Sequence, residues 1–192
     1  MKDARTLGWM MFAIVIMPAS MLFGVKSPYS SRNDEAANWV QAERAGHLLR
    51  QMRRLAFKTQ KAVGPLQVGG MDLGWEGEAQ QLTIARYDIN AMGTDLLALN
   101  RMKNGLQPWQ RRVLAKTTPE VHEMVYQMDQ ANREINANEN STALAMGQFP
   151  QNISMIDHQA SRMASVIGTF TQYARAKQRL ATLERRVSTR RG

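Results

Sequence analysis

Apolar residues recur at alternating steps of three and four along four segments of this chain, and no long run alternates with a period of two. Steps of three and four return a side chain to the same face of an α-helix, so each segment predicts an amphipathic helix. The chain therefore predicts an all-α fold. The segments are 33–63, 78–104, 108 onward and 151 toward the C-terminus.

The second segment has the most regular pattern, because its apolar positions follow the rhythm without a miss. In the first segment, the polar Thr59 fills one step of the stripe. Thr118 and Pro119 mark a place where the third segment can be interrupted, since threonine caps helices and proline starts them. The predicted stripes are Ala45, Leu48, Met52, Leu55 and Ala62; Leu82, Ala85, Ile89, Met92, Leu96 and Leu99; Val121, Met124, Met128, Ala131 and Ile135; and Ile153, Ile156, Ala160, Met163, Ile167, Phe170 and Ala174.

Four narrow apolar stripes can be hidden from water only against one another. The short break at 105–107 favours antiparallel neighbours, so we expect an antiparallel four-helix bundle. An extended coiled-coil oligomer is the alternative, because a seven-residue repeat also suits association between chains. The stripe changes register at Leu180, Leu183 and Val187, so the last turns are expected to face another neighbour or solvent.

An uncharged apolar segment, 7–25, follows a short basic tail at 1–6. As a helix it would reach roughly 28 Å, nearly the thickness of the hydrocarbon core of a bilayer. The small residues Ala19 and Ser20 fit a cleavage site poorly, so a single-pass signal anchor is favoured over a cleaved signal peptide. We expect a linker at 26–32 and a helical body at 33–192, outside the cytoplasm (periplasmic or extracellular) because the N-terminal tail is short and charged.

Two long loops are expected at the end of the bundle that points away from the membrane, at 64–77 and 139–150. In the first, Gly69 and Gly70 lie between apolar residues and suggest a small hairpin. These side chains either form a partner-binding tip or close the open end of the bundle. The residues of this tip are Leu66, Val68, Met71, Leu73 and Trp75.

The C-terminal residues form a strongly basic tail in a chain of formal net charge +9, with Glu184 as the one acid between 175 and 191. Cations at a helix end can complement the helix dipole. Alternatively they bind an anionic surface, such as the headgroups of a membrane; nucleic acid is expected only if the body is cytoplasmic. The residues concerned are Arg175, Lys177, Arg179, Arg185, Arg186, Arg190 and Arg191.

Catalytic signals are missing from the sequence. The chain has no cysteine, which excludes disulfides and thiol chemistry, and it matches no phosphate-binding loop, nucleophile elbow or zinc-protease motif. Axial rise places His47 and His122 at a different level from His158, which argues against a shared metal. We therefore expect no enzyme activity, cofactor or metal.

These features favour a membrane-anchored scaffold or assembly subunit of an envelope complex, with other membrane or envelope proteins as partners and with homo-oligomers as an option. One alternative is a protein that binds anionic lipid or nucleic acid through its basic tail. Another is a sensor bundle that holds a small ligand between its helices. A sensor of this kind needs polar breaks in the stripes, and Thr59 is the one recognised in the sequence.

Overall fold

A computed structural model describes residues 28–67, 74–138 and 141–191. These ranges contain helices and no strand, which confirms the all-α prediction. The basic tail 1–6 and the apolar segment 7–25 lie outside them. The helices are α1 (Pro28–Gln67), α2 (Gly74–Arg101), the 3₁₀ helix η1 (Lys103–Gly105), α3 (Pro108–Ala137), α4 (Ser141–Met146) and α5 (Phe149–Arg191).

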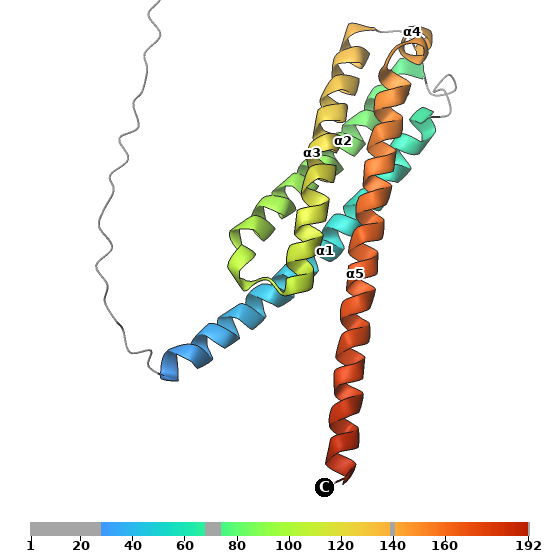
Figure 1. Cartoon of the computed structure of the whole chain (residues 1–192). Helices are drawn as coiled ribbons and strands as arrows, with labels where there is room; N and C mark the ends of the chain where they lie inside the picture. Colours follow the sequence, from blue (N-terminus) through green and yellow to red (C-terminus); the bar gives the residue numbers. More distant parts are fainter. Residues whose placement is uncertain (1–27, 68–73, 139–140, 192) are drawn as a thin grey trace, which may run out of the picture.

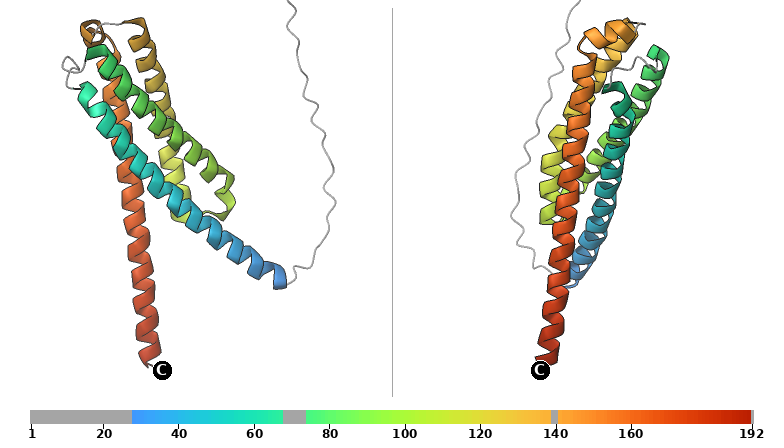
Figure 2. Two further views of the ribbon diagram at one scale, coloured as in Figure 1. Left: turned by 180° about the vertical axis from the view of Figure 1, so that it is seen from behind. Right: turned by 90° about the vertical axis from the view of Figure 1, so that its right-hand side faces the viewer.

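Four of these helices are long, and they pack around one apolar core. Following the chain in Figure 1, they run alternately in opposite directions. α1 packs against α2 and α5, and α3 packs against the same two helices, so α1 and α3 are diagonal to each other. Figure 2 shows that α1 and α5 diverge toward the end where α1 begins.

The buried residues of α2, α3 and α5 follow the predicted stripes, with Phe170 at the edge of the core. In α1, Leu49 is fully buried, whereas Leu48 is only partly buried against the core. The stripe of α1 therefore runs through Ala45, Leu49, Met52 and Ala56, one position later than expected at its second step. α1 also begins at Pro28, so it includes most of the segment predicted as a linker.

α3 continues through Pro119, and the predicted interruption there does not occur. Proline has no backbone N–H, so the carbonyl of Ala115 loses its usual donor four residues later. The two preceding threonines bond back to the same helix: Thr118 Oγ1 donates to the carbonyl of Leu114 at 2.7 Å, and Thr117 Oγ1 donates to that of Val113 at 3.0 Å. Neither bond replaces the donor that the carbonyl of Ala115 has lost.

The connection between α2 and α3 is tied to α1. Gln110 Nε2 donates a buried hydrogen bond to the carbonyl of Ala42 at 2.6 Å. The backbone N–H of Gln107 donates to Gln110 Oε1 at 2.9 Å, which caps the start of α3 with the same side chain. Gly105 lies so close to Gln41 that a Cβ at this position would overlap that side chain. A tight turn therefore closes this end of the bundle.

The opposite end is closed by the segment between α3 and α5. This segment was expected to be a loop, but it contains α4, whose Leu144 is buried, and Phe149 at the start of α5 is buried as well. Asn152 Nδ2 donates to Glu134 Oε1 at 2.8 Å and so links the start of α5 to the end of α3. Apolar residues of this loop thus belong to the core.

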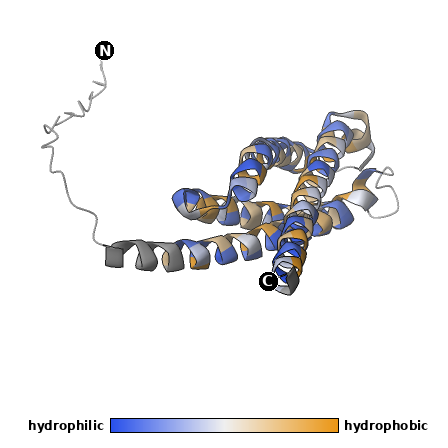
Figure 3. Ribbon diagram, turned by 60° about the horizontal axis from the view of Figure 1, so that its bottom comes forward, coloured by the Kyte–Doolittle hydropathy of each residue, from blue (hydrophilic) through white to orange (hydrophobic). Residues whose placement is uncertain are grey.

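The long helices are amphipathic, with hydrophobic and hydrophilic residues side by side along each ribbon (Figure 3). Within 28–67, 74–138 and 141–191, no helix combines the length and the apolar character that a bilayer crossing requires. The segment predicted to span the membrane is not among these residues, and its role remains a prediction.

Two leucines on α2 provide a matched test of this core. Leu99 is 0% exposed, and Leu97, two residues earlier, is 60% exposed. We expect Leu99→Ala to lower the free energy of unfolding by about 2–5 kcal/mol, because it leaves a cavity in the core. Leu97→Ala is expected to change it by less than about 0.5 kcal/mol. Chemical denaturation of both variants measures the difference, and equal losses would contradict the packing described.

Candidate functional site

The C-terminal part of α5 projects beyond the other helices as a single helix (Figures 1 and 2). Every side chain described from Arg175 to Thr189 is exposed. We call residues 175–191 the α5 extension. At 1.5 Å per residue its length is about 25 Å. An isolated helix of this length in water gains no stability from packing, so a surface that buries part of it would be favourable.

An apolar stripe runs along the α5 extension. Tyr173, Leu180, Leu183 and Val187 are 61%, 60%, 55% and 52% exposed, and Ala176 completes steps of three and four between them. The stripe that α5 packs against the bundle ends at Phe170 and Ala174, which are both half-buried, so this second stripe is displaced by one residue, or about 100° around the helix. We call it the extension seam. It presents a face that the bundle does not cover.

The predicted cations of the tail are brought together on this one helix. Arg175, Arg179, Leu183 and Arg186 line a shallow surface groove along it. Arg175 and Arg179 are four residues apart and repel each other by a few tenths of a kcal/mol. Complementing the helix dipole does not account for them, because that effect is confined to the last turn and these residues lie three turns or more from Arg191. The other predicted cations are Lys177, Arg185, Arg190 and Arg191, and the last two form the end of α5.

The residues predicted as a partner-binding tip have different positions. Leu66 belongs to α1 rather than to a hairpin and is 3% exposed in the core, so it is closed to a partner in this state. Trp75 lies in the first turn of α2 and is 38% exposed. Val68, Met71 and Leu73 are outside the ranges that the structure describes. Among the described tip residues, Trp75 is the one that a partner can reach.

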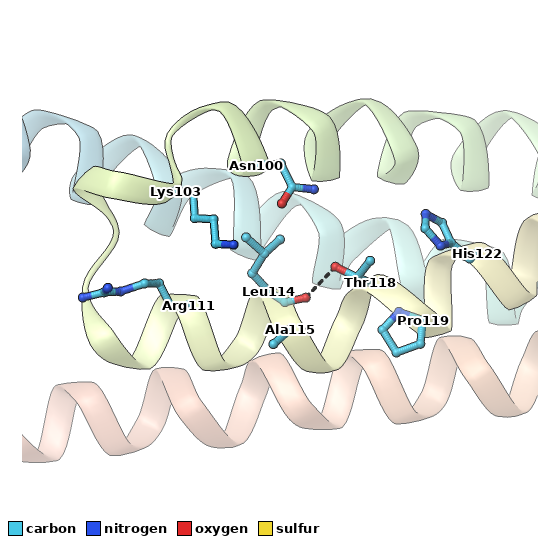
Figure 4. A pocket seen from close by; sticks show the side chains of 8 residues that line it. All are labelled: Asn100, Lys103, Arg111, Leu114, Ala115, Thr118, Pro119 and His122. Carbon is cyan, nitrogen blue, oxygen red and sulfur yellow. Dashed lines mark hydrogen bonds between the residues drawn. The ribbon is translucent and has the colours of Figure 1, made fainter. Parts of the chain in front are cut away.

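A cleft that the sequence did not suggest lies between α2, η1 and α3, and its volume is about 390 Å³. Figure 4 shows Asn100 and Lys103 entering it from the side of α2 and η1, with Thr118 and His122 rising from α3. Arg111 lies at the opposite end from His122. None of its residues is acidic; they are Asn100, Lys103, Arg111, Leu114, Ala115, Thr118, Pro119 and His122.

Two buried aspartates on α2 were also missed. Burial raises the pKa of Asp88, and the charge of Lys58 on α1 partly opposes this. Burial likewise raises the pKa of Asp95, partly opposed by His47. Asp95 Oδ2 has no hydrogen-bond partner among the described residues. The two residues are seven positions apart beside Ile89 and Leu96, and this spacing next to the stripe is the one signal that could have revealed them.

Thr59 is therefore not the one polar residue buried along the stripes, and the expectation that it was is wrong. Thr59 is fully buried, and its Oγ1 lacks a hydrogen-bond partner within the described ranges. In the same ranges, no three acidic or histidine side chains gather closely enough to hold a metal ion. The further buried polar residues are Glu78, Asp88, Asp95, Gln110, Thr117, Glu120, Asn152 and Gln159.

Comparisons with protein-family models, curated proteins and solved structures find no match to this chain. Its function has to be inferred from its own surfaces, because a helical fold alone does not specify a function. Two surfaces have a definite chemistry: the α5 extension, which is cationic with an apolar seam, and the cleft, which is cationic with an apolar floor.

The buried Asp95 predicts a pH-dependent stability. Its pKa is raised in the folded state, so its neutral form stabilises the fold below the ordinary pKa of about 4, and this contribution is lost as the pH rises through the raised value. We expect Asp95→Asn to raise the melting temperature at pH 7 relative to the wild type, and the gap to close below about pH 4.

Thermal unfolding between pH 3 and pH 8 measures this effect. Asp129→Asn is the control, because Asp129 is exposed on α3. A gap between wild type and Asp95→Asn that is the same at all pH values would contradict the assignment, as would an equal effect at Asp129.

Proposed function

We propose that this protein is a membrane-anchored scaffold or assembly subunit without enzymatic activity. The apolar segment 7–25 holds it in a membrane, and the helical body lies outside the cytoplasm. The α5 extension is its contact element, and its exposure over its whole described length is the observation that supports the proposal. A helix that the protein's own core leaves uncovered is suited to a partner.

The chemistry of the α5 extension favours an acidic helix of another envelope protein as that partner. The extension seam is narrow, with apolar residues at steps of three and four, and this is the pattern of a coiled-coil interface. Lys177, Arg179 and Arg186 flank the seam, at positions where charges choose the partner in coiled coils. Association with a second copy of the chain is less favourable, because these cations face a single acid, Glu184.

A second candidate is contact between the α5 extension and the anionic headgroups of a bilayer. The end of α5 and the start of α1 lie at the same end of the bundle (Figure 1), so a span at 7–25 would bring both close to the membrane. Basic residues near an anionic surface gain roughly 1 kcal/mol each. This candidate needs no partner protein.

Photo-crosslinking in native membranes tests the contact element. A photo-reactive amino acid at Leu183 of the full chain is expected to give one discrete protein adduct, because this side chain lies on the extension seam. Combining it with Arg179→Gln and Arg186→Gln is expected to reduce the adduct several-fold, since the flanking cations are lost.

The same photo-reactive residue at Leu97, which is exposed on α2 outside the α5 extension, is the control. A lipid adduct in place of a protein adduct at Leu183 would favour the bilayer candidate. Equal adducts at both positions, or none at either, would contradict a contact role for the α5 extension.

Protease accessibility tests the proposed orientation. The α5 extension is exposed and rich in arginine, so trypsin is expected to cut there first and to leave the packed body intact. With the body outside the cytoplasm, a C-terminal epitope is expected to be lost when trypsin reaches the outer face of intact membranes, while a cytoplasmic marker survives. Loss of the epitope only after the membranes are ruptured would place the body in the cytoplasm.

A further inference from the structure

We propose that the cleft between α2, η1 and α3 binds a phosphate ester of a small polyol. The proposal does not depend on the scaffold role or on the α5 extension. It depends on the charges, the floor and the dimensions of the cleft.

No acid lines the cleft beside its cations. Neither Lys103 nor Arg111 forms an ion pair with a described residue. The buried acids near these helices face other neighbours: Glu120 on α3 pairs with Arg162 on α5 at 3.1 Å, and Asp95 on α2 is close enough to His47 on α1 for its charge to lower the pKa of the carboxyl. The field in the cleft therefore favours an anion.

The floor and wall of the cleft suit the rest of such a ligand. Leu114, Ala115 and Pro119 give an apolar floor, which strengthens electrostatic attraction near it. Thr118 Oγ1 donates its proton to the carbonyl of Leu114, so the lone pairs of this hydroxyl oxygen remain available to a ligand in the cleft. The carbonyl of Ala115 has no donor from residue 119, because that residue is proline. Acceptors beside cations fit a ligand that combines an anionic group with hydroxyl donors.

The size of the cleft argues against a simple ion. Arg111 and His122 are eleven residues apart on α3, which is about 16 Å along the helix, so one phosphate cannot reach both ends. The volume of about 390 Å³ lies in the range of small-molecule sites. Lys103, with the amide of Asn100, is the group best placed for the phosphate, since ammonium and guanidinium groups are its usual partners in proteins. Figure 4 shows the guanidinium of Arg111 directed away from Lys103, so this side chain would have to turn inward to contact the same phosphate. The polyol would extend toward Thr118 and His122.

A phosphate ester next to hydroxyl groups occurs in two kinds of ligand, a soluble phosphate ester and the headgroup of phosphatidylglycerol. The test uses the full chain in micelles of a non-ionic detergent. One titration adds glycerol 3-phosphate and another adds inorganic phosphate, with binding followed by calorimetry. In a third, the chain is placed in nanodiscs of phosphatidylcholine with or without phosphatidylglycerol, and glycerol 3-phosphate is added again.

We expect glycerol 3-phosphate to bind more tightly than inorganic phosphate. Lys103→Gln and Arg111→Gln are each expected to weaken this binding by about tenfold, which is typical of the loss of one charged hydrogen bond. Lys116→Gln is the matched control, because Lys116 is exposed on α3 but does not line the cleft, and it is expected to change the affinity by less than about twofold. All three residues are exposed, so the melting temperatures of the variants should equal that of the wild type.

The outcomes separate the sources. Weaker binding of glycerol 3-phosphate in the presence of phosphatidylglycerol assigns the cleft to the headgroup, and unchanged binding assigns it to the soluble ester. Removing Arg179 and Arg186 from the α5 extension should leave the affinity unchanged. The proposal is overturned if glycerol 3-phosphate does not bind at millimolar concentration, or if Lys116→Gln weakens binding as much as Lys103→Gln.

Discussion

The structure depends on the mutual burial of four narrow apolar stripes, because none of the long helices can hide its own stripe from water. Each contributes at least one fully buried methionine, from Met52 on α1 and Met92 on α2 to Met124 on α3 and Met163 on α5. Methionine is unbranched and fills irregular gaps. Such a core tolerates helices that diverge, as α1 and α5 do toward one end of the bundle (Figure 2).

Much of this fold is predictable from the sequence, because a period of 3.6 residues is visible wherever a helix buries one face. The departures have local causes. Leu48 and Leu49 are adjacent and equally apolar, so the sequence does not show which of the two is buried, and the packing of the helices decides it. Hydrogen bonds from two hydroxyls accompany Pro119 in α3, and α4 is too short to show a period.

The candidate surfaces were less accessible to prediction. The cations of the tail lie within one short stretch of sequence and are easily seen, but the exposure of the extension seam depends on where the bundle ends. The cleft joins residues from α2, η1 and α3, and no local pattern connects Asn100 with His122. Asp88 and Asp95 occupy the edge of a stripe, where a carboxylate is exposed or buried according to how closely the neighbouring helix packs against it.

The one-residue displacement between the two stripes of α5 has a geometric consequence. Because the helix is continuous from Phe149 to Arg191, the azimuth of the extension seam is fixed relative to the core. A molecule docked on the seam would be held about a quarter turn around α5 from the bundle. The continuous helix would then set the orientation of the bound molecule relative to the helical body.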